Sequence, residues 1–336
     1  MTLPVQGLVH ITGEPDTGKT TLALTVPGVQ PSDIIFFDDD KKTQSIADSF
    51  VQAGSPFGYY VNLARESNAN DANKPLDFYK LVLKHLEKAR QACPDAKVLV
   101  CDNFDRFEYG VRAYSMTIME KISDLTPGQI RGMSQLTWPH TFTVYAQFLD
   151  QLNNIAPLVF IITHTRPQYV GNVKTNLLES RGQKPLIEKA NLRIWTRHNP
   201  TSPAPVGLIL KRIQKMQVTA EGIKTINVLP RRVAPCTWEK IIRYLNQPVG
   251  DRDLTLDETP TPFELSILDG VLTEDQKDAW RVARITAERE AATEDMLPDI
   301  DPDVVKAKDL QQAGYKPPQI AEEMGKTVPE VIALLK

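Results

Sequence analysis

One segment near the amino terminus has the residue types and spacing of a phosphate-binding loop. Gly13-Glu14-Pro15-Asp16-Thr17-Gly18-Lys19-Thr20 matches the pattern G-x-x-x-x-G-K-[ST] at every fixed position. Its glycines allow the backbone to curl so that N–H groups point toward phosphate oxygens. Lys19 is expected to reach the β- and γ-phosphates, and the Thr20 hydroxyl is expected to ligate Mg²⁺. Together with Thr21, the segment is a predicted nucleoside-triphosphate site.

The sequence around this segment predicts the elements that position it. An apolar run, Leu8–Thr12, precedes the loop, and a run compatible with a helix, Thr21–Val26, follows it. Helical spacing of apolar residues recurs at Asp77–Ala92 and Trp138–Leu152. Short apolar runs alternate with such stretches at 8–12, 34–37, 98–101, 158–163, 192–195 and 206–210. This alternation predicts an α/β fold with a mostly parallel central sheet.

Two of the predicted strands end in acidic residues, which a magnesium-nucleotide site needs. Asp102 follows four apolar residues where its strand leaves the sheet, and is expected to support the magnesium shell. Asp38, Asp39 and Asp40 follow the run 34–37. Because alternate residues of a strand share a face, Asp38 and Asp40 should point in one direction. A solvated acidic loop is the alternative reading of these three residues.

Charge is strongly segregated along the chain, although the net charge is only −3. Residues 164–247 hold 15 Lys/Arg against 4 Asp/Glu, and residues 248–336 hold 10 against 20. A basic block of this kind predicts a polyanion-binding segment beside an acidic tail. Internal neutralisation of one block by the other is the alternative.

The charge pattern and the local composition also divide the chain into three parts. Residues 1–247 are predicted to form the α/β core, with 54–75 as a surface excursion. Residues 248–302 are predicted to be an acidic linker with a charged helix at Thr273–Leu297. Residues 303–336 are predicted to be a small all-α module of three short helices, at Val304–Ala313, Pro317–Met324 and Val328–Leu334.

Several other kinds of protein are not favoured by the sequence. Its 3 scattered cysteines and 5 histidines favour neither a disulfide framework nor a zinc site. The sequence contains no apolar run long enough for a membrane helix and no secretory signal at its start. We therefore expect a protein of a reducing cytoplasm with no membrane partner.

The layout of residues 1–247 resembles the RecA-like P-loop ATPases, especially the compact ones that bacteriophages encode as single-strand-annealing recombinases. The resemblance implies ATP and Mg²⁺ as cofactors and ATP hydrolysis as the activity. It places the residue that polarises the attacking water at Asp40, with Asp38 as the second choice, and the magnesium-supporting aspartate at Asp102. It places the sensor of the γ-phosphate at His164, together with Thr163 as an option.

The resemblance also implies contacts with DNA and with a neighbouring subunit. Flexible loops that line single-stranded DNA fall on residues 166–189, where the cationic candidates are Arg166, Lys174, Arg181, Lys184 and Lys189. Lys211 and Arg212 correspond to the basic fingers that reach the γ-phosphate of the next subunit. A merely basic strand end is the alternative for that pair. The resemblance therefore implies self-association into a ring or filament.

The carboxyl-terminal module weakly resembles a helix-turn-helix unit. Its third helix offers no base-reading or phosphate-binding side chain before Lys336 and carries Glu330. A module that docks a protein partner is therefore the main interpretation, with DNA reading as the minor one.

Three hypotheses about function remain open at this stage. The first is a RecA-like ATPase that acts on single-stranded DNA in phage-type recombination or replication, in the cytoplasm of a bacterium or an infected host. The second is a hexameric helicase or a helicase loader. The third is a nucleotide-dependent scaffold that binds no DNA.

Overall fold

The structure is a computed structural model. It describes residues 5–40, 44–69, 74–122, 134–170, 173–180, 182–199, 202–211, 215–219, 222–226, 231–246, 259–268, 273–294, 302–312 and 316–335. Contacts divide the chain into two compact units, Met1–Arg281 and Val282–Lys336. None of the helices in the described ranges combines the length and the apolar character that crossing a bilayer requires.

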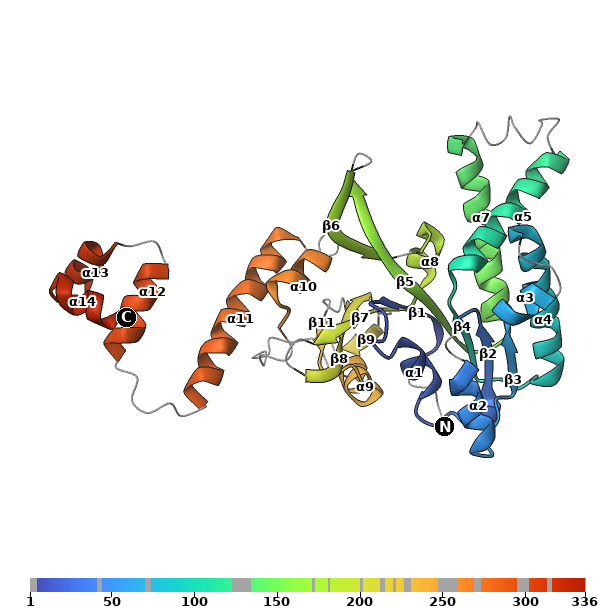
Figure 1. The fold of residues 1–336 in the computed structure, drawn as a ribbon, viewed down its shortest axis with the longest axis horizontal. Helices are drawn as coiled ribbons and strands as arrows, with labels where there is room; N and C mark the ends of the chain where they lie inside the picture. Colours follow the sequence, from blue (N-terminus) through green and yellow to red (C-terminus); the bar gives the residue numbers. More distant parts are fainter. Residues whose placement is uncertain are drawn as a thin grey trace. The chain divides into compact units, whose positions relative to one another are not determined.

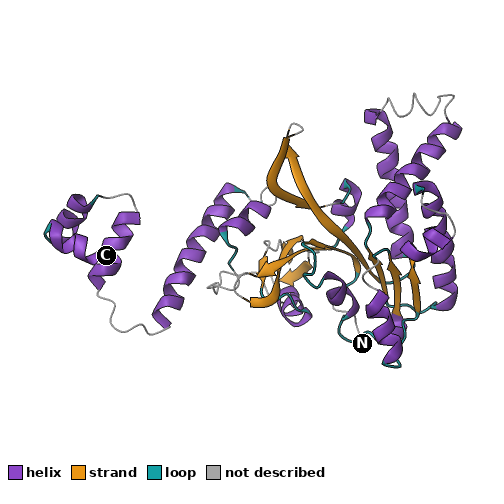
Figure 2. Cartoon of the chain, in the orientation of Figure 1, coloured by secondary structure: helices purple, strands orange, loops and turns teal. Residues whose placement is uncertain are grey.

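The first unit is built on one large sheet (Figure 2). Its strands are β1 (Gly7–Gly13), β2 (Ile34–Asp38), β3 (Tyr59–Asn62), β4 (Val98–Asp102), β5 (Leu158–Val170), β6 (Val173–Ser180), β7 (Leu192–Asn199), β8 (Ser202–Lys211) and β11 (Arg231–Val233). The strands are ordered β11-β8-β7-β1-β5-β4-β2-β3, and β6 pairs with β5. Neighbouring strands from β7 to β3 are parallel, whereas β8 and β11 are antiparallel additions at one edge. A separate hairpin pairs β9 (Lys215–Thr219) with β10 (Gly222–Ile226).

Helices cover both faces of this sheet (Figure 1). In chain order the helices of the two units are α1 (Lys19–Leu24), α2 (Gln44–Gln52), α3 (Leu63–Ala69), α4 (Pro75–Ala92), α5 (Asp105–Ile122), α7 (Ser134–Asn153), α8 (Lys184–Lys189), α9 (Trp238–Asn246), α10 (Pro262–Ile267), α11 (Glu274–Glu294), α12 (Pro302–Gln312), α13 (Pro317–Met324) and α14 (Val328–Leu334). Helices α4, α5 and α7 pack on one face, and α1 and α9 pack on the other.

The apolar runs of the sequence form strands because they are buried on both sides. Phe37 of β2 faces the core under α4, α5 and α7, whereas its neighbour Phe36 faces the core under α1 and α9. A parallel strand covered on both faces needs apolar residues at every position, which is what the sequence has. The predicted α/β fold with a mostly parallel central sheet is therefore confirmed. The strand order brings the carboxyl ends of the parallel strands β1, β5, β4 and β2 side by side.

The prediction that residues 54–75 form only a surface excursion is wrong for part of this range. Strand β3 and helix α3 lie there, and β3 extends the sheet beyond β2. Val61, Leu63 and Ala64 are buried. Only a few apolar residues are needed at a sheet edge, so the Asn- and Ser-rich neighbourhood hid a short strand from composition alone.

The prediction of flexible loops at 166–189 is also wrong for the described residues. Strand β5 continues to Val170 and pairs in antiparallel register with β6, and the short helix α8 follows. Backbone N–H and C=O groups of the extended part of β5 thereby find partners in β6. The hairpin projects from the edge of the sheet in Figure 1.

Part of the predicted acidic linker belongs to the first unit. Leu265 and Leu268, in and just after α10, and Trp280 of α11 pack against Trp195 of β7 and Leu208 of β8. Leu265, Leu268 and Trp280 all lie within residues 259–281, so this stretch covers the sheet near β8. The predicted boundaries at 247 and 302 stay predictions.

The second unit contains the three short helices that the sequence predicts at its end. Ile320 and Ala321 of α13 form a small core with Ala307 of α12 and Val331 of α14. Gly325 ends α13 with a positive φ of 63°, which glycine adopts without steric cost. The all-α character predicted for this module is confirmed.

Candidate active site

The phosphate loop connects β1 to α1 along a path that only particular residues can follow. At Gly13, φ is 150°, and a Cβ atom would lie 2.0 Å from the backbone oxygen of Thr196. Gly18 has a φ of 73° at the start of α1. The two invariant glycines of the pattern therefore stand where β7 approaches closely and where the backbone is left-handed.

Strand β7 holds this loop in place. The backbone N–H of Glu14 donates to the oxygen of Thr196 at 3.1 Å, and the Thr196 and Thr17 hydroxyls are 2.6 Å apart. His198 donates from its backbone N–H to the Glu14 carboxylate at 2.9 Å and from Nε2 to the oxygen of Pro15 at 3.0 Å. Neither Thr196 nor His198 belongs to a local sequence pattern that indicates this role. The register that pairs Gly13 with Thr196 reveals them.

Lys19 lies inside the loop and is almost fully buried, with 8% of its surface exposed. Its Nζ atom donates to the backbone oxygens of Gly13, at 3.3 Å, and Glu14, at 2.5 Å. Burial lowers the pKa of Lys19 below its ordinary value, although the negative charge of Asp102, the largest of the opposing charges, acts in the other direction. The structure thus places an ammonium group at the centre of the loop, where phosphates are expected.

Thr20 and Asp102 meet where α1 begins and β4 ends. The Thr20 hydroxyl donates to Oδ2 of Asp102, whose carboxyl is buried. Burial raises the pKa of Asp102 to about 6, and the hydrogen bond from Thr20 acts against this rise. A hydroxyl and a carboxylate are hard oxygen donors, and Mg²⁺ at nucleotide sites uses few protein ligands together with waters and phosphate oxygens. The donor set therefore fits Mg²⁺. Within the described residues, no group of three or more Asp, Glu, His or Cys side chains could hold a metal ion.

The three acidic residues after β2 differ in their surroundings. Asp38 is fully buried beside Asp102 in the β2–β4 register, and its Oδ2 accepts hydrogen bonds from Tyr60, at 2.8 Å, and Asn62, at 3.4 Å. Asp40 is half-buried, and its negative charge acts on Asp102 and on Lys19. Asp38 and Asp40 thus lie near the phosphate loop.

Asp39 has a different partner from its two neighbours. Its Oδ1 atom lies 2.7 Å from a guanidinium nitrogen of Arg106 on α5. Burial raises the pKa of Asp39 to about 7, although the charge of Arg106 acts against that rise. The Arg106 guanidinium also stacks over the Phe78 ring at 4.0 Å and donates to the Ser67 hydroxyl at 3.2 Å. Arg106 of α5 therefore connects the acidic end of β2 to α3 and α4. No local pattern in the sequence indicates this role.

His164 lies beside the phosphate loop, at the position paired with Gly13 in the β1–β5 register. Its Nδ1 atom is 3.6 Å from a carboxylate oxygen of Asp105, and its side chain is about one third exposed. Thr163, the optional sensor, is fully buried, and its hydroxyl lies 2.8 Å from Nε2 of His10. Of the two, the structure leaves only His164 accessible at the loop.

The structure brings few of the predicted DNA-contacting cations together. Arg166 is exposed on the extension of β5. Lys184 and Lys189 lie on α8, where they pair with Glu188 at 3.6 Å and with Asp150 at 2.5 Å. The other predicted cations lie outside what the structure describes: residues Arg181 and Arg212 entirely, and the side chains of Lys174 and Lys211.

Within the described residues, the segregated charges neutralise each other around Glu264. Glu264 of the acidic block is buried and contacts Arg232, at 3.1 Å, and Arg197, at 3.8 Å, of the basic block. The Arg197 guanidinium also lies over the Phe263 ring at 4.5 Å. Internal neutralisation therefore accounts for part of the basic excess.

Asp102→Asn tests the electrostatics of this site in the absence of nucleotide and Mg²⁺. The folded-state pKa of Asp102, about 6, lies above its ordinary value of 3.8, so the folded state binds the extra proton between these values. As pH rises from about 4 to about 7, the wild type should lose about 2 kcal/mol of unfolding free energy relative to Asp102→Asn. Urea unfolding of both proteins across this pH range measures the difference. A difference in unfolding free energy that stays constant with pH would show that the pKa of Asp102 is the same in the folded and the unfolded protein.

Comparison with known proteins gives a distant likeness to solved structures. No protein family matches the sequence, and neither does any curated protein. Among solved structures, the chain is similar to a KaiC-like protein from the hyperthermophilic archaeon Pyrococcus horikoshii OT3, with 13% identity and a TM-score of 0.32. The match covers 66% of this chain and 89% of that protein.

Proposed function

We propose that this chain binds ATP with Mg²⁺ and hydrolyses it. The observation that carries the proposal is that Lys19 lies inside the loop while Thr20 and Asp102 touch beside it. An ammonium, backbone N–H groups and a pair of oxygen ligands are the parts that hold a triphosphate. Sequence pattern and tertiary contacts thus support the same chemistry.

Each residue of the site has a distinct part in this reaction. Lys19 exchanges its bonds to the Gly13 and Glu14 oxygens for bonds to phosphate oxygens. Asp40, half-exposed near Lys19, accepts a proton from the attacking water, and Asp38 is the alternative base. His164 contacts the γ-phosphate. Thr20 and Asp102 would hold Mg²⁺, which would supply positive charge beside the phosphates.

We further propose that the ATPase acts on single-stranded DNA in phage-type recombination or replication, as an annealing or recombinase-like protein. Two features support this: the basic excess of residues 164–247, and the β5–β6 hairpin, whose first strand passes directly from His164 to exposed Arg166. Cations on a projecting hairpin can follow a phosphate backbone. Assembly into a ring or filament, with Lys211 and Arg212 reaching a neighbouring nucleotide, belongs to the same proposal.

Charge reversal in the basic block tests the proposed DNA binding. Changing Lys174, Arg181 and Lys184 together to Glu should weaken oligonucleotide binding similarly for all sequences. Because each neutralised phosphate releases counterions, the slope of log affinity against log salt should become shallower by about 2. Fluorescence anisotropy at several salt concentrations measures both effects.

The matched control reverses a lysine outside the basic block. Lys80 lies on α4 and is exposed beside Asp77, so Lys80→Glu should leave the salt slope unchanged. Equal affinity before and after the triple reversal would show that the basic block does not bind the strand. Failure to bind oligonucleotides at low salt, despite intact ATP binding, would favour a nucleotide-dependent scaffold that binds no DNA. Directional strand unwinding coupled to ATP hydrolysis would instead favour a helicase or a helicase loader.

A further inference from the structure

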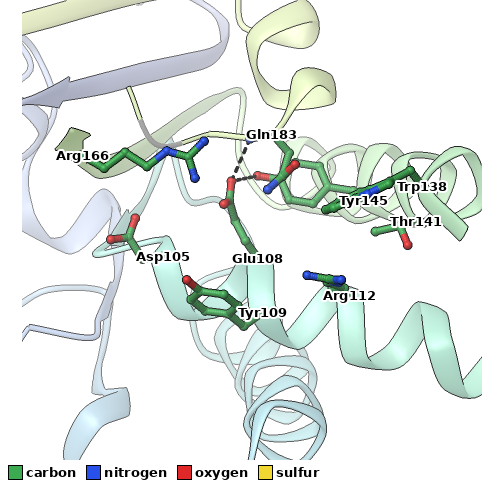
Figure 3. A pocket seen from close by; sticks show the side chains of 9 residues that line it. All are labelled: Asp105, Glu108, Tyr109, Arg112, Trp138, Thr141, Tyr145, Arg166 and Gln183. Atoms are coloured by element: carbon green, nitrogen blue, oxygen red, sulfur yellow. Dashed lines mark hydrogen bonds between the residues drawn. The ribbon is translucent and has the colours of Figure 1, made fainter. Parts of the chain in front are cut away.

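A cavity of about 340 Å³ lies next to the candidate active site (Figure 3). Helices α5 and α7, the extended part of β5 and the residue before α8 form its walls. Its lining combines aromatic, acidic and cationic side chains: Asp105, Glu108, Tyr109, Arg112, Trp138, Thr141, Tyr145, Arg166 and Gln183. The ATP site does not use this cavity, and only Asp105, through its contact with His164, belongs to both.

Glu108 presents a directional hydrogen-bonding group to the cavity. Its Oε1 atom accepts hydrogen bonds from the Tyr145 hydroxyl, at 2.7 Å, and from the backbone N–H of Gln183, at 3.0 Å. These bonds fix the carboxyl group in one orientation, with Oε2 turned toward the side of the cavity where Arg166 lies (Figure 3). Oε2 is thus an acceptor held in position by two donors on the other oxygen.

The aromatic walls of the cavity offer flat surfaces for stacking. The Arg112 guanidinium lies 4.8 Å from the centroid of the Trp138 ring, so the two form a layered platform. Tyr109 is 60% exposed, although large aromatic side chains are usually covered. An aromatic ligand can stack on either surface, and such stacking is largely independent of the ligand's identity.

The charges of the lining favour a neutral planar group attached to an anion. Two carboxylates and two guanidinium groups balance one another, so a bare cation or anion gains little inside. Arg166 is exposed and can bind a phosphate that is attached to the planar group. A nucleobase with its phosphate has these properties.

We propose that the cavity receives one unstacked base of the bound single strand, with the edge of the base on Glu108 and its flat face on Tyr109 or Trp138. The proposal rests on the proposed function, because the strand must first be bound. A carboxylate accepts hydrogen bonds from an exocyclic amino group, so cytosine is favoured over thymine, which presents a carbonyl there. The cavity thereby adds base preference to binding that is otherwise independent of sequence.

The first experiment separates base contacts from backbone contacts. Affinities are measured for a single-stranded oligodeoxynucleotide and for the same sugar-phosphate backbone without bases. Tyr109→Ala should reduce the preference of the wild type for the strand with bases by about tenfold. Tyr114→Ala is the matched control, because Tyr114 lies on the same helix outside the cavity, stacked on Tyr79. Tyr114→Ala should prefer the strand with bases as strongly as the wild type does.

The second experiment tests the role of Glu108 with oligo(dC) and oligo(dT). In Glu108→Gln, the side-chain oxygen should stay with the donors from Tyr145 and Gln183, so that the amide NH₂ group points into the cavity. The wild type should prefer oligo(dC) by about tenfold, and the variant should lose or reverse this preference. Circular dichroism and thermal unfolding of each variant verify the fold.

The outcomes distinguish this proposal from the one on which it rests. Salt-dependent binding of oligonucleotides with equal affinity for strands with and without bases would overturn the cavity proposal alone. Absence of any oligonucleotide binding would overturn DNA binding and the cavity proposal together. Displacement of the strand by micromolar deoxycytidine monophosphate would show that the cavity takes free nucleotides, and would overturn the strand as the source of the base.

Discussion

Lys19→Ala should abolish ATP hydrolysis and weaken ATP binding. The wild-type Nζ atom is buried within hydrogen-bonding distance of the Gly13 and Glu14 oxygens, so its loss leaves the loop without a cation for the phosphates. Loss of one such electrostatic contact lowers turnover by at least about a hundredfold. Phosphate release measures turnover, and titration with a fluorescent ATP analogue measures binding.

The matched control for this prediction is Lys97→Ala. Lys97 is half-exposed, and its Nζ atom lies 2.8 Å from a carboxylate oxygen of Asp33. It precedes β4, at the opposite end of that strand from Asp102. Its removal should leave turnover unchanged, because exposed ion pairs contribute little to the folded state. If Lys19→Ala hydrolysed ATP at the wild-type rate, the phosphate-loop interpretation would be wrong, and the proposed ATPase with it.

Asp40→Asn should keep ATP binding and lose turnover, which traps the ATP-bound state. Asp40 is half-buried near Lys19 and Asp102, where an attacking water could reach it. Removal of a general base lowers the rate by about a hundredfold or more. Single-turnover hydrolysis, measured beside equilibrium ATP binding, separates the two effects.

The neighbouring aspartates supply the controls for Asp40. Asp39 pairs with Arg106, so Asp39→Asn should change stability more than it changes ATP turnover. Asp38 accepts bonds from Tyr60 and Asn62, so Asp38→Asn should loosen the strand end. If Asp38→Asn traps the ATP-bound state and Asp40→Asn does not, then Asp38 is the base.

The sequence by itself determined the parts of the site that depend on local spacing. The loop from Gly13 to Thr20 could be predicted because its backbone path needs glycine at fixed positions, and those positions lie within one short segment. Asp102 could be predicted because a buried parallel strand is apolar throughout and ends at its first polar residue. The three terminal helices were predictable for a similar reason, because proline stands in the first turn of each and glycine ends α13.

Only the tertiary structure decided which distant residues complete the site. Thr196 and His198 hold the phosphate loop because β7 lies next to β1, although 179 to 184 residues separate the partners. Arg106 reaches Asp39 because β4, which precedes α5, pairs with β2. The cavity around Glu108 exists because α5, α7 and β5 converge. Hydrogen bonds and ion pairs depend on distance in space, and a sequence pattern reports only distance along the chain. The strand order of the sheet decides which residues distant in the sequence become neighbours in space, and only the folded chain shows that order.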